Sequence, residues 1–235
     1  MQLSESGFRN FGKEFESIPF VKQNLKFEIM KKLFLGLGLV AGTFAFAQTS
    51  PSFGLKAGLN ISSISDDGYE DSKSKAGFYG GVFMNAPLSE QFSIQPEVMY
   101  SQLGAKTDYK LAGTTFSNEL KLDYITVPVM FQFRATPAFY LEAGPEFGFL
   151  VSAKSKNTVS NGNGSGSDTN ELNKDNFNGF NFGLGLGLGF DITKNFGVNA
   201  RYTAGFSDVT KPESDPSTDA KNRNNNFQVG LSYKF

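Results

Sequence analysis

The segment Phe227-Gln-Val-Gly-Leu-Ser-Tyr-Lys-Phe235 decides the fold class of this sequence. Every second side chain in it is large and apolar, and small or polar side chains lie between them. A period of two predicts a β-strand with one apolar face. After several similar strands, a last strand that ends on an aromatic residue is typical of an outer-membrane β-barrel whose last strand pairs with its first.

The first 47 residues resemble a targeting region rather than a folded one. Met30-Lys31-Lys32 is a short basic segment, residues 33–47 form an apolar run too short to span a membrane, and Ala45-Phe46-Ala47 supplies small residues before Gln48. We therefore expect a signal peptide at residues 30–47. Residues 1–29 are either a non-native extension upstream of the true start or a short native extension.

Composition narrows the classes of function. The chain of 235 residues has formal net charge −1 and contains no Cys and no His. This charge argues against a nucleic-acid partner, which would need a basic surface. The missing His removes the commonest general base and metal ligand, and we expect neither a cofactor nor a metal.

Eight segments alternate between apolar and small or polar residues. Each has about the length that a tilted strand needs to cross the hydrocarbon layer, roughly 9–11 residues. They are residues 53–61, 75–86, 92–101, 124–134, 139–149, 180–190, 196–206 and 227–235. The sequence therefore predicts an all-β domain within residues 48–235, an eight-stranded antiparallel up-and-down transmembrane β-barrel.

The connectors between these segments alternate in length. Those at 87–91, 135–138 and 191–195 are tight turns, and those at 63–74, 104–118, 153–176 and 208–225 are long and polar. Short periplasmic turns and long extracellular loops are typical of bacterial outer-membrane barrels. We expect the protein in the outer membrane with its long loops outside the cell.

Aromatic residues recur near the short-turn end of the apolar faces. We expect them to form a ring at the membrane interface. They are Phe53, Phe92, Phe133, Phe139, Phe190, Phe196 and Phe235. The alternative, that these residues form the core of a soluble β-domain, leaves the sorting of loop lengths unexplained.

Three segments carry a family resemblance: residues 92–106 (FSIQPEVMYSQLGAK), 122–130 (LDYITVPVM) and 139–149 (FYLEAGPEFGF). They resemble the PorT-like outer-membrane β-barrel family of Bacteroidota, often labelled porin family. The resemblance implies a barrel in a Gram-negative outer membrane and implies little about activity, although the namesake assists secretion of proteins to the cell surface. Pro96, Pro128 and Pro145 lie in these segments, and we expect bulges or widened pairing there.

The face opposite the apolar one carries charged residues. An eight-stranded barrel has a lumen filled by side chains, so we expect a structural charge network inside it. Its members are Lys56, Glu97, Arg134, Glu142, Glu146, Arg201 and Lys234. We expect Arg201 to pair with Glu97, with Glu146 or with both, because an unpaired buried charge is costly. A pair of carboxylates also suits a glycosidase, but a filled lumen offers no substrate cleft.

Two other motifs give only weak indications of a binding site. The glycines at 183, 185, 187 and 189 have a period of two with no basic residue after them, which is not the pattern of a phosphate-binding loop. An acidic group in the first long connector is either a solvated loop tip or a Ca²⁺ site, and its spacing matches no known calcium loop. This group is Asp66, Asp67, Glu70 and Asp71.

We therefore expect a non-enzymatic integral outer-membrane protein that presents four extracellular loops for structural or surface-recognition roles. The alternatives are a small channel or transport-related porin, and an accessory of protein secretion to the cell surface. An outer-membrane hydrolase or acyltransferase is disfavoured by the lack of His. The expected partners are outer-membrane lipid, the barrel-assembly machinery through the C-terminal strand ending at Phe235, and an unidentified surface ligand.

Overall fold

A computed structural model describes residues 50–65, 73–161, 164–211 and 222–235. The expected upstream extension, the expected signal peptide and the acidic group at residues 66–71 lie outside the described residues. Within them, no helix is long and apolar enough to cross a membrane.

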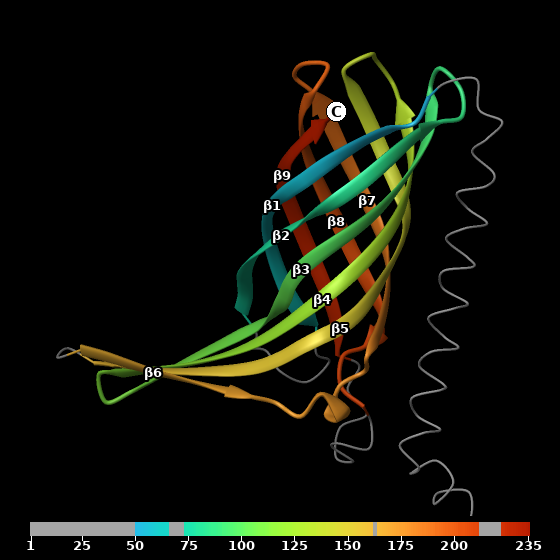
Figure 1. Cartoon of the computed structure of the whole chain (residues 1–235). Helices are drawn as coiled ribbons and strands as arrows, with labels where there is room; N and C mark the ends of the chain where they lie inside the picture. The colour runs from blue at the N-terminus through green and yellow to red at the C-terminus, as the bar shows by residue number, and fades with distance from the viewer. Residues whose placement is uncertain (1–49, 66–72, 162–163, 212–221) are drawn as a thin grey trace, which may run out of the picture. The chain divides into compact units, whose positions relative to one another are not determined.

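The described residues form nine strands and one short 3-10 helix (Figure 1). The bounds of the elements, in chain order, are β1 Ser52–Ser65, β2 Lys73–Pro87, β3 Phe92–Leu111, β4 Thr114–Arg134, β5 Phe139–Asn161, β6 Gly164–Glu171, η2 Lys174–Asn176, β7 Phe180–Asp191, β8 Phe196–Asp208 and β9 Arg223–Lys234.

Eight of these strands close into an antiparallel ring, which confirms the predicted fold. Their hydrogen-bonded order is β4–β3–β2–β1–β9–β8–β7–β5, and β4 also pairs with β5. The last strand pairs with the first from Gly54↔Lys234 to Ser65↔Arg223. Beyond β9, the backbone N–H of Phe235 donates to the carbonyl oxygen of Phe53 at 2.9 Å. Closure leaves the ring without a free edge, as a membrane-spanning sheet requires.

The alternation in sequence becomes an outside and an inside. In β7 the leucines face outward, with Leu186 at 68% exposure, while the glycines between them are buried. In β1, Leu59 is 68% exposed, whereas Asn60 is fully buried. A soluble β-domain would bury the leucines instead, so the arrangement matches a barrel whose outer face contacts lipid.

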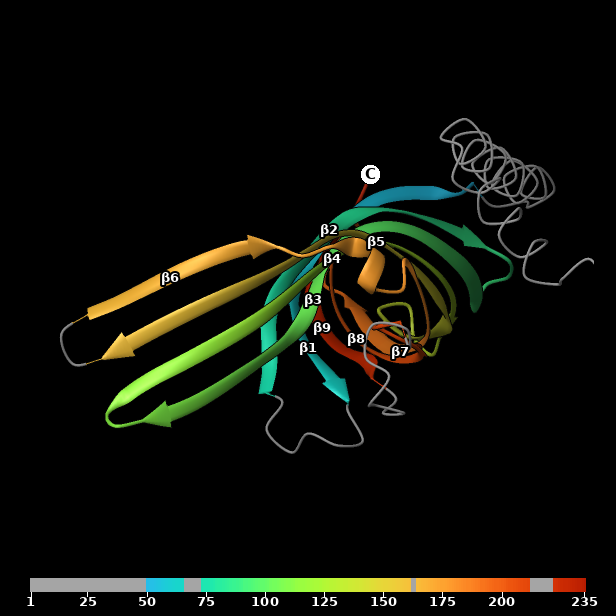
Figure 2. The same ribbon diagram turned by 90° about the horizontal axis from the view of Figure 1, so that it is seen from below.

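A feature that the sequence did not predict is a four-stranded sheet that extends β3, β4 and β5 beyond the ring and adds β6 (Figures 1 and 2). We call it the arm and define it as residues 105–111, 114–120, 154–161 and 164–171. The connectors at 104–118 and 153–176 were expected to be loops, and strand pairing through most of their length corrects this. The arm lies at the end of the barrel opposite the tight turns (Figure 1).

The three strand prolines are accommodated by gaps in pairing rather than by bulges. Pairing between β2 and β3 jumps from Phe83↔Glu97 to Ala86↔Ile94, which skips Pro96. Pairing between β3 and β4 stops after Pro96↔Val129 and resumes at Met99↔Thr126 in the same register, which skips Pro128. Pairing between β4 and β5 likewise stops at Pro128↔Glu146 and resumes at Phe131↔Ala143, which skips Pro145. Proline has no N–H to donate, so the missing bonds fall where the donors are missing. The register shifts lie elsewhere, for example between Asp123 and Tyr124.

Candidate functional site

The centre of the lumen holds an ion network built around Arg201 of β8. Its guanidinium donates to both carboxylate oxygens of Glu97 on β3, with Nη2–Oε1 at 2.8 Å and Nη1–Oε2 at 3.0 Å. Lys56 on β1 donates to the same carboxylate at 2.6 Å. All three residues are at most 3% exposed. Three strands that are separate in the ring are thus joined across the lumen by one carboxylate.

Glu142 of β5 is the second partner of Arg201. Its Oε1 accepts from Nε of Arg201 at 2.7 Å. Gly187 of β7 lies between these residues in the sheet, paired with Glu142 on one side and with Arg201 on the other. A Cβ on Gly187 would lie 3.0 Å from the Glu142 side chain, so the glycine leaves room for the ion pair to pass over β7.

Amide side chains complete the hydrogen bonding of the two carboxylates. Gln95 donates to Glu97 at 2.9 Å, and Gln132 donates to Glu142 at 3.0 Å. Asn85 in turn donates to the side-chain oxygens of both glutamines, at 3.1 and 2.8 Å. These amides lie between the ion network and the turn end of the lumen, and every one of them is buried. A buried charge is tolerated in a protein interior only when its hydrogen-bonding groups have partners in this way.

Arg134, expected in the same network, belongs to a separate group near the tight turns. It donates to Asp191 at 2.9 Å, and Lys234 donates to the same carboxylate at 2.8 Å. The side chains of this group are 15–23% exposed, in contrast to the fully buried central network. Asp191 was not among the expected interior residues because it ends β7, where the sequence suggested only a turn.

Glu146 is buried at 7% exposure but does not pair with Arg201. Arg201 was expected to pair with Glu97, with Glu146 or with both, and Glu142 stands in place of Glu146. One oxygen of Glu146, Oε2, has no hydrogen-bond partner. Other unpartnered polar atoms belong to buried side chains on the loop side of Arg201, namely Tyr124, Thr203, Asn224 and Asn226.

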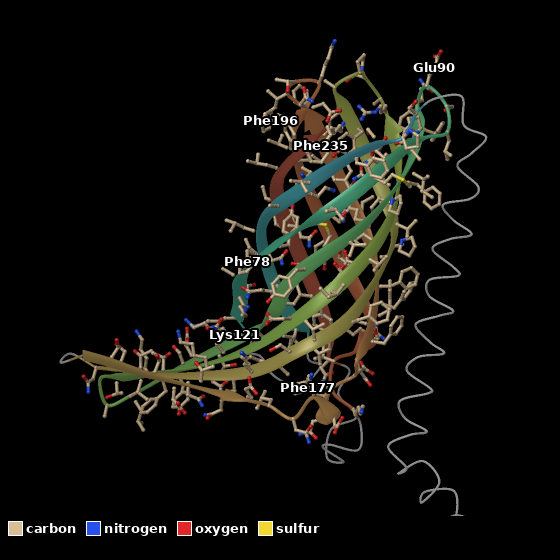
Figure 3. The ribbon with its side chains drawn as sticks, in the orientation of Figure 1. Phe78, Glu90, Lys121, Phe177, Phe196 and Phe235 are labelled. Carbon is tan, nitrogen blue, oxygen red and sulfur yellow. The ribbon has the colours of Figure 1, made fainter. Side chains whose placement is uncertain are left out.

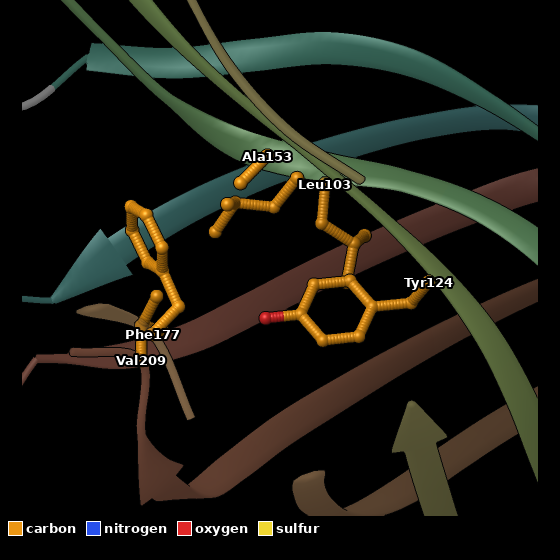
Figure 4. Close-up of a cluster of buried hydrophobic side chains, with 6 residues drawn as sticks. Leu103, Tyr124, Ala153, Phe177 and Val209 are labelled. Atoms are coloured by element: carbon orange, nitrogen blue, oxygen red, sulfur yellow. The ribbon is translucent and has the colours of Figure 1, made fainter. Parts of the chain in front are cut away.

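An apolar cluster occupies the lumen at the loop end (Figure 4). It contains residues from β3, β4 and β5 together with Phe177, which follows η2, and Val209, which follows β8. Its buried members are Leu103, Leu122, Tyr124, Ala153, Phe177 and Val209. The segments carrying Phe177 and Val209 are joined by hydrogen bonds, including Asn178 N–H to the Val209 carbonyl at 2.8 Å. Among the described residues, this cluster therefore fills the end of the lumen that faces the long loops.

Phe196 and Phe235, two of the seven aromatic residues expected at the membrane interface, point away from the lumen (Figure 3). Six of the seven are 37–72% exposed, and Phe139 is half-buried. Some contact one another, such as Phe92 and Phe133 with ring centroids 5.2 Å apart. The contact of these rings with the interface region of the bilayer remains our prediction.

The arm has two unlike faces. One carries Tyr109 stacked on Phe116, with centroids 4.9 Å apart and planes 7° apart, beside Val159 in the next strand. The other carries charged and hydroxyl side chains, including Asp108, which accepts from Ser117 at 2.6 Å. Tyr109 is 57% exposed and Val159 is 43% exposed. Apolar side chains are thus exposed on a sheet that projects from the barrel.

The interior arrangement does not suit hydrolysis. The glutamates that approach each other, Glu97 and Glu142, share Arg201 as a common partner, and both are saturated by hydrogen bonds. A general acid must face its substrate, whereas these two carboxylates are buried and engaged in ion pairs with Arg201. Among the described residues, no group of three or more His, Cys, Asp or Glu is placed to hold a metal ion.

A family model described as an outer membrane protein β-barrel domain matches residues 46–211. The chain belongs to this family. The family and the closed ring with an apolar outer face together place the protein in the outer membrane, embedded in lipid by its eight-stranded barrel. A comparison with curated protein sequences finds no match.

Several solved structures are similar in fold. Ail, the attachment invasion locus protein of Yersinia pestis, has 17% identity and a TM-score of 0.47, and the match covers 80% of this chain and all of Ail. Neisserial surface protein A has 15% identity, a TM-score of 0.42 and the same coverage. CarO of Acinetobacter baumannii has 14% identity and a TM-score of 0.41 over 77% of this chain and 97% of CarO.

Proposed function

We propose that this protein is a non-enzymatic surface-recognition protein whose barrel anchors the arm outside the cell. The arm carries the proposal. It holds an apolar group in which exposed Tyr109 and Val159 flank half-buried Phe116, on paired strands that continue directly from the barrel wall. An apolar patch kept in water at an energetic cost is typical of an interaction site. Long outer-membrane barrel loops face the exterior, so the patch is available to extracellular partners.

The interior argues against conduction as the main role. Lys56, Glu97 and Arg201 bridge the lumen at its centre, and the apolar cluster follows toward the loop end. An ion passing through would have to separate buried ion pairs, which costs several kcal/mol. We expect little or no current when the purified protein is inserted into planar bilayers. Steady single-channel openings would favour the porin alternative.

Binding by the nanodisc-embedded protein tests the proposal. The probes are arrays of glycans and of extracellular-matrix proteins, compared between the native chain and the double variant Tyr109→Ser, Phe116→Ser. The matched control is Thr158→Ser, on the opposite face of the arm. We expect the native protein and the control to bind the same probes and the double variant to lose them. Equal binding by all three proteins, or binding by none, would contradict surface recognition by this face.

We also infer that the chain falls in the PorT-like branch of its family. Support comes from the segments at 92–106, 122–130 and 139–149, each with a proline at a gap in strand pairing. No residue here maps onto a role in secretion. Deletion of the gene, followed by an assay of surface proteins in the medium and on the cell, tests the secretion alternative. Loss of those proteins from the surface would favour it over recognition.

We also propose how the chain is targeted to the outer membrane and assembled there. We expect cleavage before Gln48 and assembly by the barrel-assembly machinery, which recognises C-terminal strands ending in an aromatic residue. In support, Phe235 is 72% exposed and lies edge-on to Tyr233, with centroids 5.5 Å apart. N-terminal sequencing of the membrane form tests the cleavage. Deleting Phe235 should lower the yield of heat-modifiable barrel in the outer membrane, and an unchanged yield would count against this route.

A further inference from the structure

The buried charges at the centre of the lumen do not balance. Lys56 and Arg201 provide two positive charges, while Glu97, Glu142 and Glu146 provide three carboxylates. The remaining buried charge, Lys75, lies 3.9 Å from Glu119 on β4, which is also paired with Lys121. Glu146 is therefore left without a counter-charge of its own.

The unpartnered oxygen atom of Glu146 lies near buried polar side chains whose oxygen atoms also accept no hydrogen bond. The Thr203 hydroxyl interacts with the Glu146 carboxyl group, and no other side chain donates a hydrogen bond to its oxygen atom. Thr203 faces Asn226 across the β8–β9 pair. The amide nitrogen of Asn226 donates to Asn60 at 3.4 Å, but its oxygen is unpartnered. All three side chains are at least 93% buried.

The wall between these side chains is made of glycine. Glu146 is paired with Gly183 of β7, and Gly183 is paired with Gly205 of β8. Neither residue places a side chain between Glu146 and the polar groups of β8 and β9. In the row nearer the turns, Gly187 lets Glu142 reach Arg201 in the same way. Glu146 likewise lies beside two neighbouring glycines, but no arginine lies beyond them to pair with its carboxylate.

We propose that Glu146, Thr203 and Asn226 bind a monovalent cation inside the lumen. A carboxylate, a hydroxyl and an amide carbonyl are the hard oxygen ligands that hydrated alkali and alkaline-earth cations prefer. One positive charge balances the central group of Lys56, Arg201 and the three glutamates, whereas a divalent ion would leave that group with an excess positive charge. A cation also satisfies oxygen atoms that would otherwise be buried without a partner, which is costly.

The position of the site suggests slow exchange. The Arg201 network lies on its turn side, and the apolar cluster of Figure 4 lies on its loop side. A cation at Glu146 would be held between them rather than pass through. A cation bound at this site would stabilise the barrel. This role is separate from the recognition that we propose for the arm.

Thermal unfolding in different salts tests the site. The processed protein in detergent is heated in KCl, NaCl or RbCl and in choline chloride at equal ionic strength, with unfolding followed by heat-modifiable gel migration. We expect at least one alkali cation to raise the melting temperature over choline by about 2–4 °C at a concentration about fivefold above its dissociation constant. Glu146→Gln should remove this difference. Glu171→Gln, at an exposed arm residue, is the matched control and should retain it.

Crystals grown in RbCl test the position. We expect an anomalous peak among the Glu146, Thr203 and Asn226 oxygen atoms that is absent from Glu146→Gln crystals. If Glu146→Gln does not fold, Thr203→Val keeps the carboxylate and removes one ligand, and it should weaken the salt effect roughly tenfold in cation concentration. Equal melting temperatures in all salts would overturn the proposal. So would an infrared band of a neutral carboxyl group that Glu146→Gln removes, because a proton would then balance the charge.

Discussion

The barrel wall and the arm are made from the same strands, yet their sequences follow different rules. β3, β4 and β5 run through both regions without interruption. In the wall, one face meets lipid and the other a packed polar lumen, so Leu186 is exposed while Arg201 is buried. In the arm both faces are exposed, and the apolar face keeps only a few large side chains such as Tyr109 and Val159. The solvent on each side of a sheet, more than the backbone pairing, sets the pattern of its residues.

The same contrast applies to ion pairs. The side chains of Arg201 and Glu97 are 3% and 0% exposed, whereas those of Lys154 and Glu171 on the arm are 41% and 86% exposed. Water screens the arm pair, and such pairs contribute about 0–1 kcal/mol. Charges in the lumen have lost their water and depend on their partners. Substitutions should therefore have large effects in the lumen and small effects in the arm.

The largest effect is expected for Arg201→Ala. The substitution leaves Glu97 and Glu142 buried without their shared partner, and breaking a buried pair in this way costs about 3–5 kcal/mol. Unfolding by guanidinium in lipid vesicles should show this loss. The chain has no Trp, so far-UV circular dichroism or gel migration serves as the signal.

Arg134→Ala is the control for this prediction. It also removes an arginine from an ion pair, but its side chain is 23% exposed near the turns. We expect a loss smaller than half of that for Arg201→Ala. Equal losses would mean that burial in the lumen does not decide the strength of these pairs.

An intermediate effect is expected for Gly230→Ala in β9. A Cβ at this position would clash with the hydroxyl of Tyr79, which donates to Asn199 at 2.9 Å across the lumen, and with the backbone carbonyl oxygen of Ala57. Overpacking of this kind costs about 1–3 kcal/mol. The double variant Gly230→Ala, Tyr79→Phe should recover part of the loss in the same unfolding measurement. No loss in the single variant would show that the lumen is less tightly filled than the structure indicates.

The smallest effect is expected in the arm. The hydrogen bond from Ser117, with support from Lys106 and Lys73, lowers the pKa of Asp108 below its ordinary value of about 3.9. The charged form is therefore favoured by the folded hairpin, and this contribution is present above pH of about 4 and is lost as the pH falls through the lower, folded pKa. Ser117→Ala should raise the pKa of Asp108 toward its ordinary value in an NMR titration, with almost no change in barrel stability. An unchanged pKa would rule out Ser117 as the main cause.

Much of the barrel was predictable from its sequence because alternation records which side faces lipid. The segment Phe227–Phe235 and the Leu–Gly repeat of β7 showed this directly. The arm was not predictable by the same route. Its strands, such as Gly164–Glu171, are rich in Gly, Ser and Asn and are exposed on both faces, so they resemble loops.

Contacts within the lumen were predictable only in part. The alternation of apolar and polar residues placed Arg201 and the glutamates inside the barrel. Alternation does not determine the register between neighbouring strands. Register places Glu142, Gly187 and Arg201 in one row, and Glu146 in another row with Gly183. The partner of Arg134, Asp191, lies where a strand ends, and alternation carries no information there.

A membrane-embedded barrel requires lipid at the outer face of the ring, and paramagnetic NMR in nanodiscs measures this contact directly. We predict that a doxyl-labelled lipid broadens the signals of Leu59, Leu186 and Leu231, which are 60–68% exposed, and spares Tyr109 on the arm. A water-soluble gadolinium chelate should give the reverse pattern. Broadening of those leucines by the chelate and not by the lipid would contradict the membrane-embedded barrel.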